Sequence, residues 1–368
     1  MALRWLLVLA ALRLAVAGYA SAVPVNRPPT AHHHHAEWDG LAQTTITPGQ
    51  RRGELIMELP AVDLPVGGMV RQAASVGEFP IGGSIYGVRA EIVDGTGRQL
   101  PMELLHHMNV MDPSARELFL PIARRILASG GETEEIRLPW LLVGSPFQAG
   151  EHVLAYAMVH NPTSESFQGV RVRLVLSYVP AGRPWPFFSV VPWQLDVAFP
   201  VGDKSFDLPS GHSERAYEGS PAVAGKLLAI GGHMHPYGQT IELWDATTNE
   251  LLWHGEPEPA PAGEASPIPM GKFYGLTRIG LRITPEHRYR VRVVYENPTG
   301  KVLPDGGMGV IGGLFIPDRD AAWPEPNTGE ALYQKDLQHF MGLNQPAASP
   351  MMMPGGGGAG GAHSHVGH

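Results

Sequence analysis

The sequence predicts an all-β protein, built as two tandem antiparallel, jelly-roll-like β-sandwiches with few short helices. The chain of 368 residues contains 45 glycines and 35 prolines. This density of turn residues favours many short strands over long helices. Strand-like segments recur in two series of about 120–150 residues each, which suits one sandwich per series.

The first series begins near Gly53. In GVRVRLVLSYV, apolar residues from Val170 to Tyr178 alternate with Arg171, Arg173 and Ser177, as in a strand with one buried face. The strands expected in this series are residues 55–59, 86–93, 104–110, 136–143, 153–160 and 170–178.

The second series follows RPWPFFSVVPW, residues 183–193, a segment rich in proline and aromatics that we expect to be a hinge or a crossing between the sandwiches. Apolar residues alternate with arginines in YRVRVVYE, again typical of a half-buried strand. The strands expected here are residues 197–199, 227–231, 240–245, 279–283, 289–296 and 309–316.

Two helices are expected. For residues 112–130, Asp112 is a candidate N-cap, Pro113 fits the first helical position, Gly130 follows the end and Pro121 would kink the helix. Residues 330–341 have an amphipathic pattern closed by Gly342.

The amino-terminal segment has Arg4, an apolar stretch and a small-x-small pattern ending at Ala22, which predicts a secretory signal peptide. An uncleaved amphipathic anchor is the alternative. No other apolar run approaches the ~20 residues that span a bilayer. We therefore expect an exported protein, secreted or periplasmic, with no stable membrane insertion after cleavage.

These patterns divide the chain into five parts. After the signal peptide comes a disordered arm rich in His and Pro, whose run His32–His35 either catches metal ions or is simply solvated. The expected divisions are 1–22 signal peptide, 23–50 arm, 51–192 first sandwich, 193–322 second sandwich, and 323–368 short helix with a flexible tail rich in Met, Gly and His.

Composition excludes several classes of function. The chain has no cysteine, which rules out disulfides, thiolate metal ligands and a cysteine nucleophile. The net charge of −8 comes without a basic run, so nucleic-acid binding is not supported. No nucleophile elbow, phosphate loop or dinucleotide fingerprint is present.

The stretch AIGGHMHPYG places His233 and His235 two residues apart at the end of an expected strand. Side chains two apart on a strand share a face, so both imidazoles would point the same way. Met234 between them would point to the opposite face, into the core. The pair either binds a metal ion or consists of two histidines at a strand end where a turn begins.

Three further places carry possible ligands. His106 and His107 are adjacent, so on a regular strand they would face opposite ways, and joint binding would need a bulge or an edge position. His160 ends a strand before an Asn-Pro turn, and Met308 lies among glycines. Each of these residues alone has an ordinary structural explanation.

Together these residues suggest two metal sites, one with three histidines and one with two histidines and a methionine. The chain has 17 histidines and 14 methionines. Imidazole suits copper and zinc, and an added thioether selects copper.

Three of these segments resemble the ascorbate-dependent type II copper monooxygenases, typified by dopamine β-monooxygenase and the peptidylglycine α-hydroxylating enzyme. LLHHMNVMD is similar to the family's His-His-Met strand, and VHNPTSESFQGVRVRLVLSY to its later His-containing strand and turn. GGHMHPYGQTIELWD resembles its His-x-His strand. The resemblance covers residues 50–317, and the intervals between the motifs also match.

The resemblance implies a fold of two jelly-roll-like sandwiches with two copper ions facing each other across a cleft. His106, His107 and His160 would bind the electron-transfer copper. His233 and His235 would bind the copper at which O₂ is activated.

The third ligand of the second copper is open between two residues. Met308 fits by its distance in sequence from His235, and a second alignment of the glycine-rich strand places Leu314 there instead. The family's basic residue before the His-x-His motif has no counterpart in residues 229–232. The Tyr and Asn that follow the family's methionine are also missing, which argues against a peptidylglycine substrate.

The expected function is a copper monooxygenase that hydroxylates a small substrate with O₂ and a reductant such as ascorbate. A non-catalytic copper-binding or trafficking protein on the same scaffold is the alternative. Adhesion or assembly with vestigial sites is a third.

Overall fold

The computed structural model describes residues 38, 40–131, 133, 135–199, 204–258, 268–275 and 279–342. The expected signal peptide, the run His32–His35 and the tail after Gly342 lie outside the described residues. None of the helices in the described part of the chain is both long and apolar enough to span a membrane.

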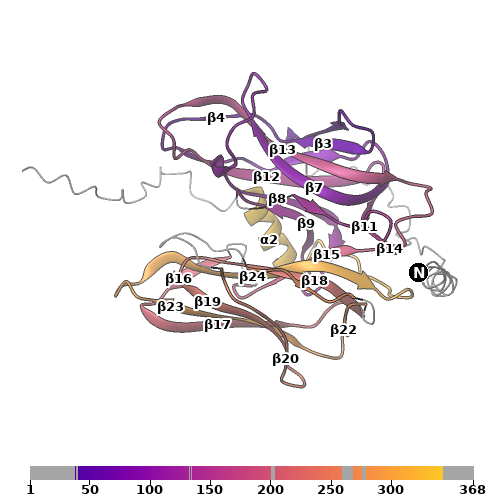
Figure 1. Ribbon diagram of the computed structural model, residues 1–368, viewed down its shortest axis with the longest axis vertical. Helices are drawn as coiled ribbons and strands as arrows, with labels where there is room; N and C mark the ends of the chain where they lie inside the picture. Colours follow the sequence, from indigo (N-terminus) through magenta and orange to yellow (C-terminus); the bar gives the residue numbers. More distant parts are fainter. Residues whose placement is uncertain are drawn as a thin grey trace, which may run out of the picture.

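The predicted all-β class with two tandem sandwiches is confirmed (Figure 1). Each sandwich packs two sheets over its own hydrophobic core. Among the strand pairs that the structure describes, only β1–β6 and β11–β14 are parallel.

The first sandwich occupies the upper half of Figure 1. One of its sheets contains β1 (Ala42–Gln43), β6 (Ser75–Glu78), β12 (His152–His160), β8 (Leu105–Arg116) and β9 (Ala123–Ser129), with β5 (Met69–Arg71) beside β12. The other contains β14 (Phe188–Ser189), β11 (Val143–Phe147), β7 (Gly83–Val93), β13 (Phe167–Pro180), β3 (Glu54–Glu58) and β2 (Thr45–Pro48), with β10 (Ile136–Arg137) and β4 (Val62–Leu64) at its margins. A short 3₁₀ helix, η2 (Met102–Leu104), leads into β8.

The second sandwich occupies the lower half. Its inner sheet, on the side of the first sandwich, contains β15 (Val191–Asp196), β24 (Leu303–Pro317), β18 (Gly225–Met234) and β21 (Gly271–Lys272), with β16 (Ser205–Leu208) on β24 and β22 (Leu281–Ile283) on β18. Its outer sheet contains β17 (Gly211–Gly219), β23 (Tyr289–Asn297), β19 (Gly238–Asp245) and β20 (Glu250–Gly255). The chain passes between the sandwiches at Val190, between β14 and β15.

The two sandwiches share one local structural feature, a buried asparagine at a turn. Asn161 directly follows β12 and Asn297 is the last residue of β23, each within an Asn-Pro-Thr sequence, and both side chains are buried. The Asn161 amide donates to the carbonyls of Leu64, Pro65 and Glu165. The Asn297 amide makes the equivalent three bonds, to Leu208, Pro209 and Lys301. One buried amide therefore fixes the corresponding turn in each half.

The helix expected at residues 330–341 is present as α2 (Ala331–Met341). Gly342 ends it in the left-handed conformation, with φ of 78°, which glycine adopts without a Cβ penalty. The Arg71 guanidinium donates to the last carbonyls, those of His339 and Phe340, at 3.0 Å each. The helix packs on the face of the first sandwich that looks towards the second (Figure 1).

The helix expected at residues 112–130 is wrong. This segment is a hairpin, with β8 running to Arg116 and β9 starting at Ala123. The Asp112 carboxylate does accept a backbone N–H, as an N-cap would. The donor is Ser114, at 2.9 Å, and both residues lie within β8. Tertiary packing overrides the local helix signals in this segment, because the apolar residues of the hairpin loop are buried in the core of the second sandwich.

Three other expectations need smaller corrections. Residues 42–48, placed in the disordered arm, form β1 and β2, because Ile46 is buried in the first core. Residues 136–143 are not one strand but β10 and the start of β11, separated by a stretch that contains Pro139. Residues 197–199 form a turn, since the Asp196 carboxylate accepts the Ala198 N–H at 2.8 Å and ends β15.

The loop between β8 and β9 is buried in the other sandwich. Leu118, Phe119, Leu120 and Ile122 all belong to the hydrophobic core of the second sandwich. The Phe119 ring lies 5.5 Å from that of Trp193, between ring centroids. The first sandwich thus completes the core of the second.

Buried polar groups fix this loop and the helix beside it. The Glu117 carboxylate accepts backbone N–H groups from Leu118, Arg125 and Gln194 at 2.8–3.2 Å, and burial raises its pKa. Arg125 makes a bidentate pair with Asp336 of α2, with both N···O distances 2.6 Å. Removing one partner of such a buried pair leaves an uncompensated charge.

We predict that Phe119→Ala lowers the free energy of unfolding by about 3–5 kcal/mol, the usual cost of truncating a buried aromatic side chain. Phe187→Ala is the matched control, because Phe187 is 40% exposed and surface changes stay within about 0.5 kcal/mol. Urea unfolding of both variants measures the difference. Equal stabilities would contradict the role given to the loop.

Candidate metal centre

The first histidine pair lies at a β-bulge in β8. On β12, Met158 is paired with His107 and the next residue, Val159, with Leu105, so His106 is an extra residue in β8. A bulge of this kind turns consecutive side chains away from strict alternation. The centroids of the His106 and His107 rings are 4.9 Å apart. The irregularity that joint binding requires is therefore present.

His160 shares a face with His107 but is not part of the pair. It follows Met158 by two residues on β12, and Met158 lies directly opposite His107, so all three point to the same side. That side is the one turned away from the first core, where Ala157 and Val159 are buried. Across the described ranges, no three side chains of His, Cys, Asp or Glu come close enough together to hold a metal ion.

The second histidine pair lies where β18 ends. The His233 and His235 ring centroids are 5.8 Å apart. Met234 between them is buried in the second core with an exposed fraction of 1%, as the alternation predicted. The two rings therefore lie on the side of the sheet that is turned away from that core.

The strand register places Met308, and not Leu314, near the second histidine pair. On β24, Val310 is paired with His233 and Gly309 with Met234, so the next step brings Met308 beside His235 on the same face. Leu314 is paired with Ala229, four residues from His233, or about 13 Å along the strand. Met308 is the residue that accompanies the histidines.

A tyrosine hydroxyl holds these two neighbours together. Tyr295 of β23 accepts the backbone N–H of His235 at 3.0 Å and that of Met308 at 3.1 Å. Its own O–H donates to the Met308 carbonyl. A hydroxyl has one donor and two acceptor sites, so the Tyr295 hydroxyl is saturated. Burial raises its pKa to about 12, and it remains a phenol.

The Tyr295 hydroxyl replaces a strand ladder that ends at this point. The pairing of β18 with β24 stops at Met234, and β24 continues against β16 instead, with Ser205 opposite Met308. The residue after His235 is Pro236, which has no N–H to donate. The His235 ring is also fixed, with Nδ1 3.2 Å from the Asp305 carbonyl.

Both histidine pairs lie on the sheet faces that the two sandwiches turn towards each other (Figure 1). Burial, followed by the charge of His106, lowers the pKa of His107 to about 4, and His233 contributes to the same shift. Burial, followed by the charge of His233, lowers the pKa of His235 to about 4, and His106 contributes. Each pair is thus within electrostatic range of the other. The His107 and His235 rings are neutral near pH 7, the form that can bind a metal.

Charged groups of the second sandwich lie near the same interface. Asp196 is paired with Val310, which is paired in turn with His233, so the Asp196 carboxylate shares the face of the histidines. The Lys204 ammonium lies 3.7 Å from this carboxylate and 2.6 Å from the Gln194 side-chain oxygen. Burial raises the pKa of Asp196 and lowers that of Lys204.

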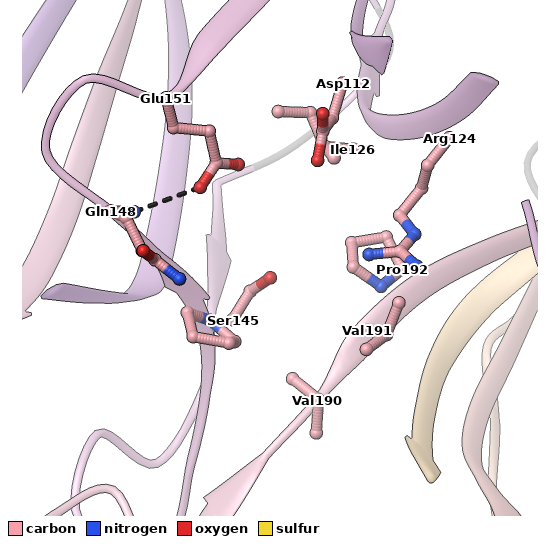
Figure 2. Close-up of a pocket in the computed structure, with 10 residues that line it drawn as sticks. Asp112, Arg124, Ile126, Ser145, Gln148, Glu151, Val190, Val191 and Pro192 are labelled. Carbon is pink, nitrogen blue, oxygen red and sulfur yellow. Dashed lines mark hydrogen bonds between the residues drawn. The ribbon is translucent and has the colours of Figure 1, made fainter. Parts of the chain in front are cut away.

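A small cavity lies elsewhere in the interface. It has a volume of about 60 Å³, which is room for a few water molecules. Figure 2 shows Asp112 and Arg124 on one side, and Gln148 with Glu151 on the other. None of the six candidate ligands lines it, so this cavity is not part of the histidine site.

Sequence reasoning missed four residues at the site. Tyr295 and Asp196 come from strands far from the histidines in sequence and carry no local signal. Met158 and Met69 lie on the face of His107 and His160, with Met69 directly opposite His160. The Met-x-His spacing of residues 158 and 160 was the signal for the first of these methionines, because it is the same period of two that marks the His-x-His pair.

No protein-family model matches this chain, and no curated protein does. Among solved structures, PNGase F, a glycosylasparaginase from Flavobacterium meningosepticum, is similar over 73% of this chain and 97% of that chain, with 9% identity and a TM-score of 0.37. PNGF-II is similar over 75% and 61%, with 9% identity and a TM-score of 0.33. The VP2 subviral particle of infectious bursal disease virus is similar over 77% and 76%, with 13% identity and a TM-score of 0.24. Likenesses this low say nothing of the chemistry of this chain.

We predict that Tyr295→Phe lowers the free energy of unfolding by about 1–3 kcal/mol, since buried backbone groups of His235 and Met308 lose their partner. We also expect the ring resonances of His235 to shift in an NMR spectrum. Tyr289→Phe is the matched control on the same strand, because that hydroxyl accepts the Thr284 N–H at 3.1 Å, away from the histidines. If Tyr295→Phe leaves the His235 resonances in place, the hydroxyl does not position that residue.

Proposed function

We propose that this chain is a two-copper protein, with one ion on each sandwich, and that it hydroxylates a small substrate with O₂ and a reductant such as ascorbate. The observation that supports this most is the facing arrangement of His106–His107 and His233–His235, contributed by different sandwiches and within electrostatic range.

The donor atoms fit copper better than other common metals. Both pairs offer imidazole, which suits copper and zinc, and Met308 adds a thioether beside His235, which favours copper. The chain has no cysteine, so thiolate zinc sites are excluded. The neutral state of His107 and His235 leaves nitrogen lone pairs free of protons near pH 7.

Two redox-active ions suit the electron count of a monooxygenase. Insertion of one oxygen atom from O₂ into a C–H bond yields the alcohol and water, and it consumes two electrons and two protons, which a reductant of the ascorbate class supplies. Copper, when bound, would carry these electrons singly. The protein contributes the neutral ligands, the fixed position of His235 and Met308, and the separation of the two pairs.

The surroundings of His233 also bear on the substrate. A Cβ atom built at Gly231 would meet nothing within 4 Å, and Gly231 shares the face of His233 two residues on. Residues 229–232 carry no basic side chain. We therefore infer a small substrate that is not held by a carboxylate at this segment.

Non-catalytic copper handling is the second candidate function. It is favoured by Met69 and Met158, soft side chains on the face of His107 that a catalytic site does not require.

We predict two tightly held copper ions per chain after loading and dialysis. His107→Ala and His233→Ala should each retain about one ion fewer, because each removes a ligand of one site. His254→Ala is the matched control, since His254 lies on β20 of the outer sheet and contacts Glu256 at 3.0 Å. Metal analysis of the dialysed proteins gives the count. Loss of all copper from the unaltered chain would contradict the proposal.

Catalysis is tested separately, with an oxygen electrode. The doubly loaded protein should consume O₂ with ascorbate faster than either single-site variant. Two bound ions without such consumption would exclude the monooxygenase and favour copper handling.

A further inference from the structure

Methionine side chains extend the first histidine cluster on the face that carries it. Across β5, β12 and β8, the residues Arg71, Met158 and His107 form one directly paired row. The neighbouring row pairs His160 with Met69. Because paired residues and residues two apart share a face, these five side chains all lie on the side turned away from the first core.

Met158 and Met69 are not core residues of the first sandwich. Both are partly buried, whereas Met108 and Met57 of the same sandwich are at most 1% exposed within its core. Neither Met158 nor Met69 belongs to the hydrophobic clusters formed by the described residues. Methionine normally fills gaps in a core, whereas these two thioethers lie on the face that carries the histidines.

Met158 lies within reach of the histidine pair. Directly opposite residues in an antiparallel ladder have Cβ atoms about 4.5–5.5 Å apart, and Met158 is opposite His107. His106, the bulged residue, lies next to it, with its ring centroid 4.9 Å from that of His107. The methionine side chain is long and flexible, which lets its sulfur approach both rings.

The donor set of the first cluster is incomplete without sulfur. No three His, Cys, Asp or Glu side chains in the described part of the chain converge on one point. His160 lies two residues further along β12 than Met158, the residue opposite His107. An ion at His106 and His107 needs a further donor, and the side chain between these histidines and His160 is a thioether.

The charge of the surroundings favours a monovalent ion. Arg71 is directly paired with Met158, in the same row as His107, which places a fixed positive charge beside the cluster. Its guanidinium is engaged with the carbonyls at the end of α2 and lies over the Tyr156 ring, 4.3 Å from the centroid. Neutral nitrogen and sulfur donors beside a fixed positive charge suit a soft ion of single charge better than a divalent one.

We propose that the first cluster is a histidine–methionine site for Cu(I), in which the Met158 sulfur binds the same ion as His106 and His107 and Met69 supplies a second thioether beside His160. This rests on the proposed copper function and departs from an all-histidine first site. Both copper sites then contain sulfur, and both stabilise the reduced ion.

The experiment isolates the first site. A His233→Ala/His235→Ala double variant removes the second pair, so that the Cu(I) lost when His106→Ala and His107→Ala are added belongs to the first cluster. X-ray absorption of this variant loaded with Cu(I) should show sulfur as well as nitrogen scatterers. Adding Met158→Leu should remove the sulfur contribution attributed to Met158 and weaken Cu(I) binding by about tenfold, measured against a Cu(I) chelator.

Met57→Leu in the same background is the matched control, because Met57 is fully buried in the first core, and it should change neither quantity. Circular dichroism verifies that each variant is folded. Cu(I) held by nitrogen alone would overturn the inference while leaving the copper function intact. Unchanged Cu(I) affinity and sulfur scattering in the Met158→Leu variant would also overturn it. Failure of the double variant to bind Cu(I) would overturn both this inference and the first site of the proposed function.

Discussion

The burial of one hairpin loop in the core of the other sandwich is the constraint on which the rest of this structure depends. Leu118, Phe119 and Ile122 leave the sheet of the first sandwich and become core residues of the second. Separating the sandwiches would expose these side chains to water, at a cost of about 1.5–3 kcal/mol for each one that becomes fully exposed. The loop therefore fixes β8, which carries the first histidine pair, relative to β18, which carries the second.

Helix α2 is a second connection between the two sandwiches. Helix α2 follows the second sandwich in sequence but packs on the first, through the Arg125–Asp336 pair and the contact of Phe340 with Tyr156. A buried ion pair contributes little net stability compared with apolar packing, and its role is better described as fixing one arrangement. Arg71 joins this helix to the row of Met158 and His107. The helix and the first cluster are thus positioned by the same strand.

Periodicity in the sequence was sufficient for the fold class and for most strands, because a half-buried strand carries its alternation in its own residues. It also gave the helix ending at Gly342, since the capping signal is local. It failed for residues 112–130, where Asp112 and Pro113 resemble a helix start but Asp112 caps Ser114 within a strand. Nothing in that segment alone shows that Phe119 is needed in a distant core.

Part of the candidate site could likewise be predicted from the sequence, and part required the structure. His233 and His235 share a face by strand geometry, and the burial of Met234 bears this out. The choice of Met308 over Leu314 required the register of β18 with β24, which depends on a pairing between segments about 75 residues apart. Tyr295 was beyond sequence reasoning, because its hydroxyl reaches His235 and Met308 from a strand of the other sheet.

The proposed two-copper function requires that the two histidine clusters, one on each sandwich, hold ions at close range. Electron paramagnetic resonance of the protein loaded with Cu(II) at both sites tests it most directly, with the His107→Ala and His233→Ala variants as single-site references. We predict dipolar broadening in the doubly loaded protein that neither variant shows. A spectrum equal to the sum of the two single-site spectra would contradict it.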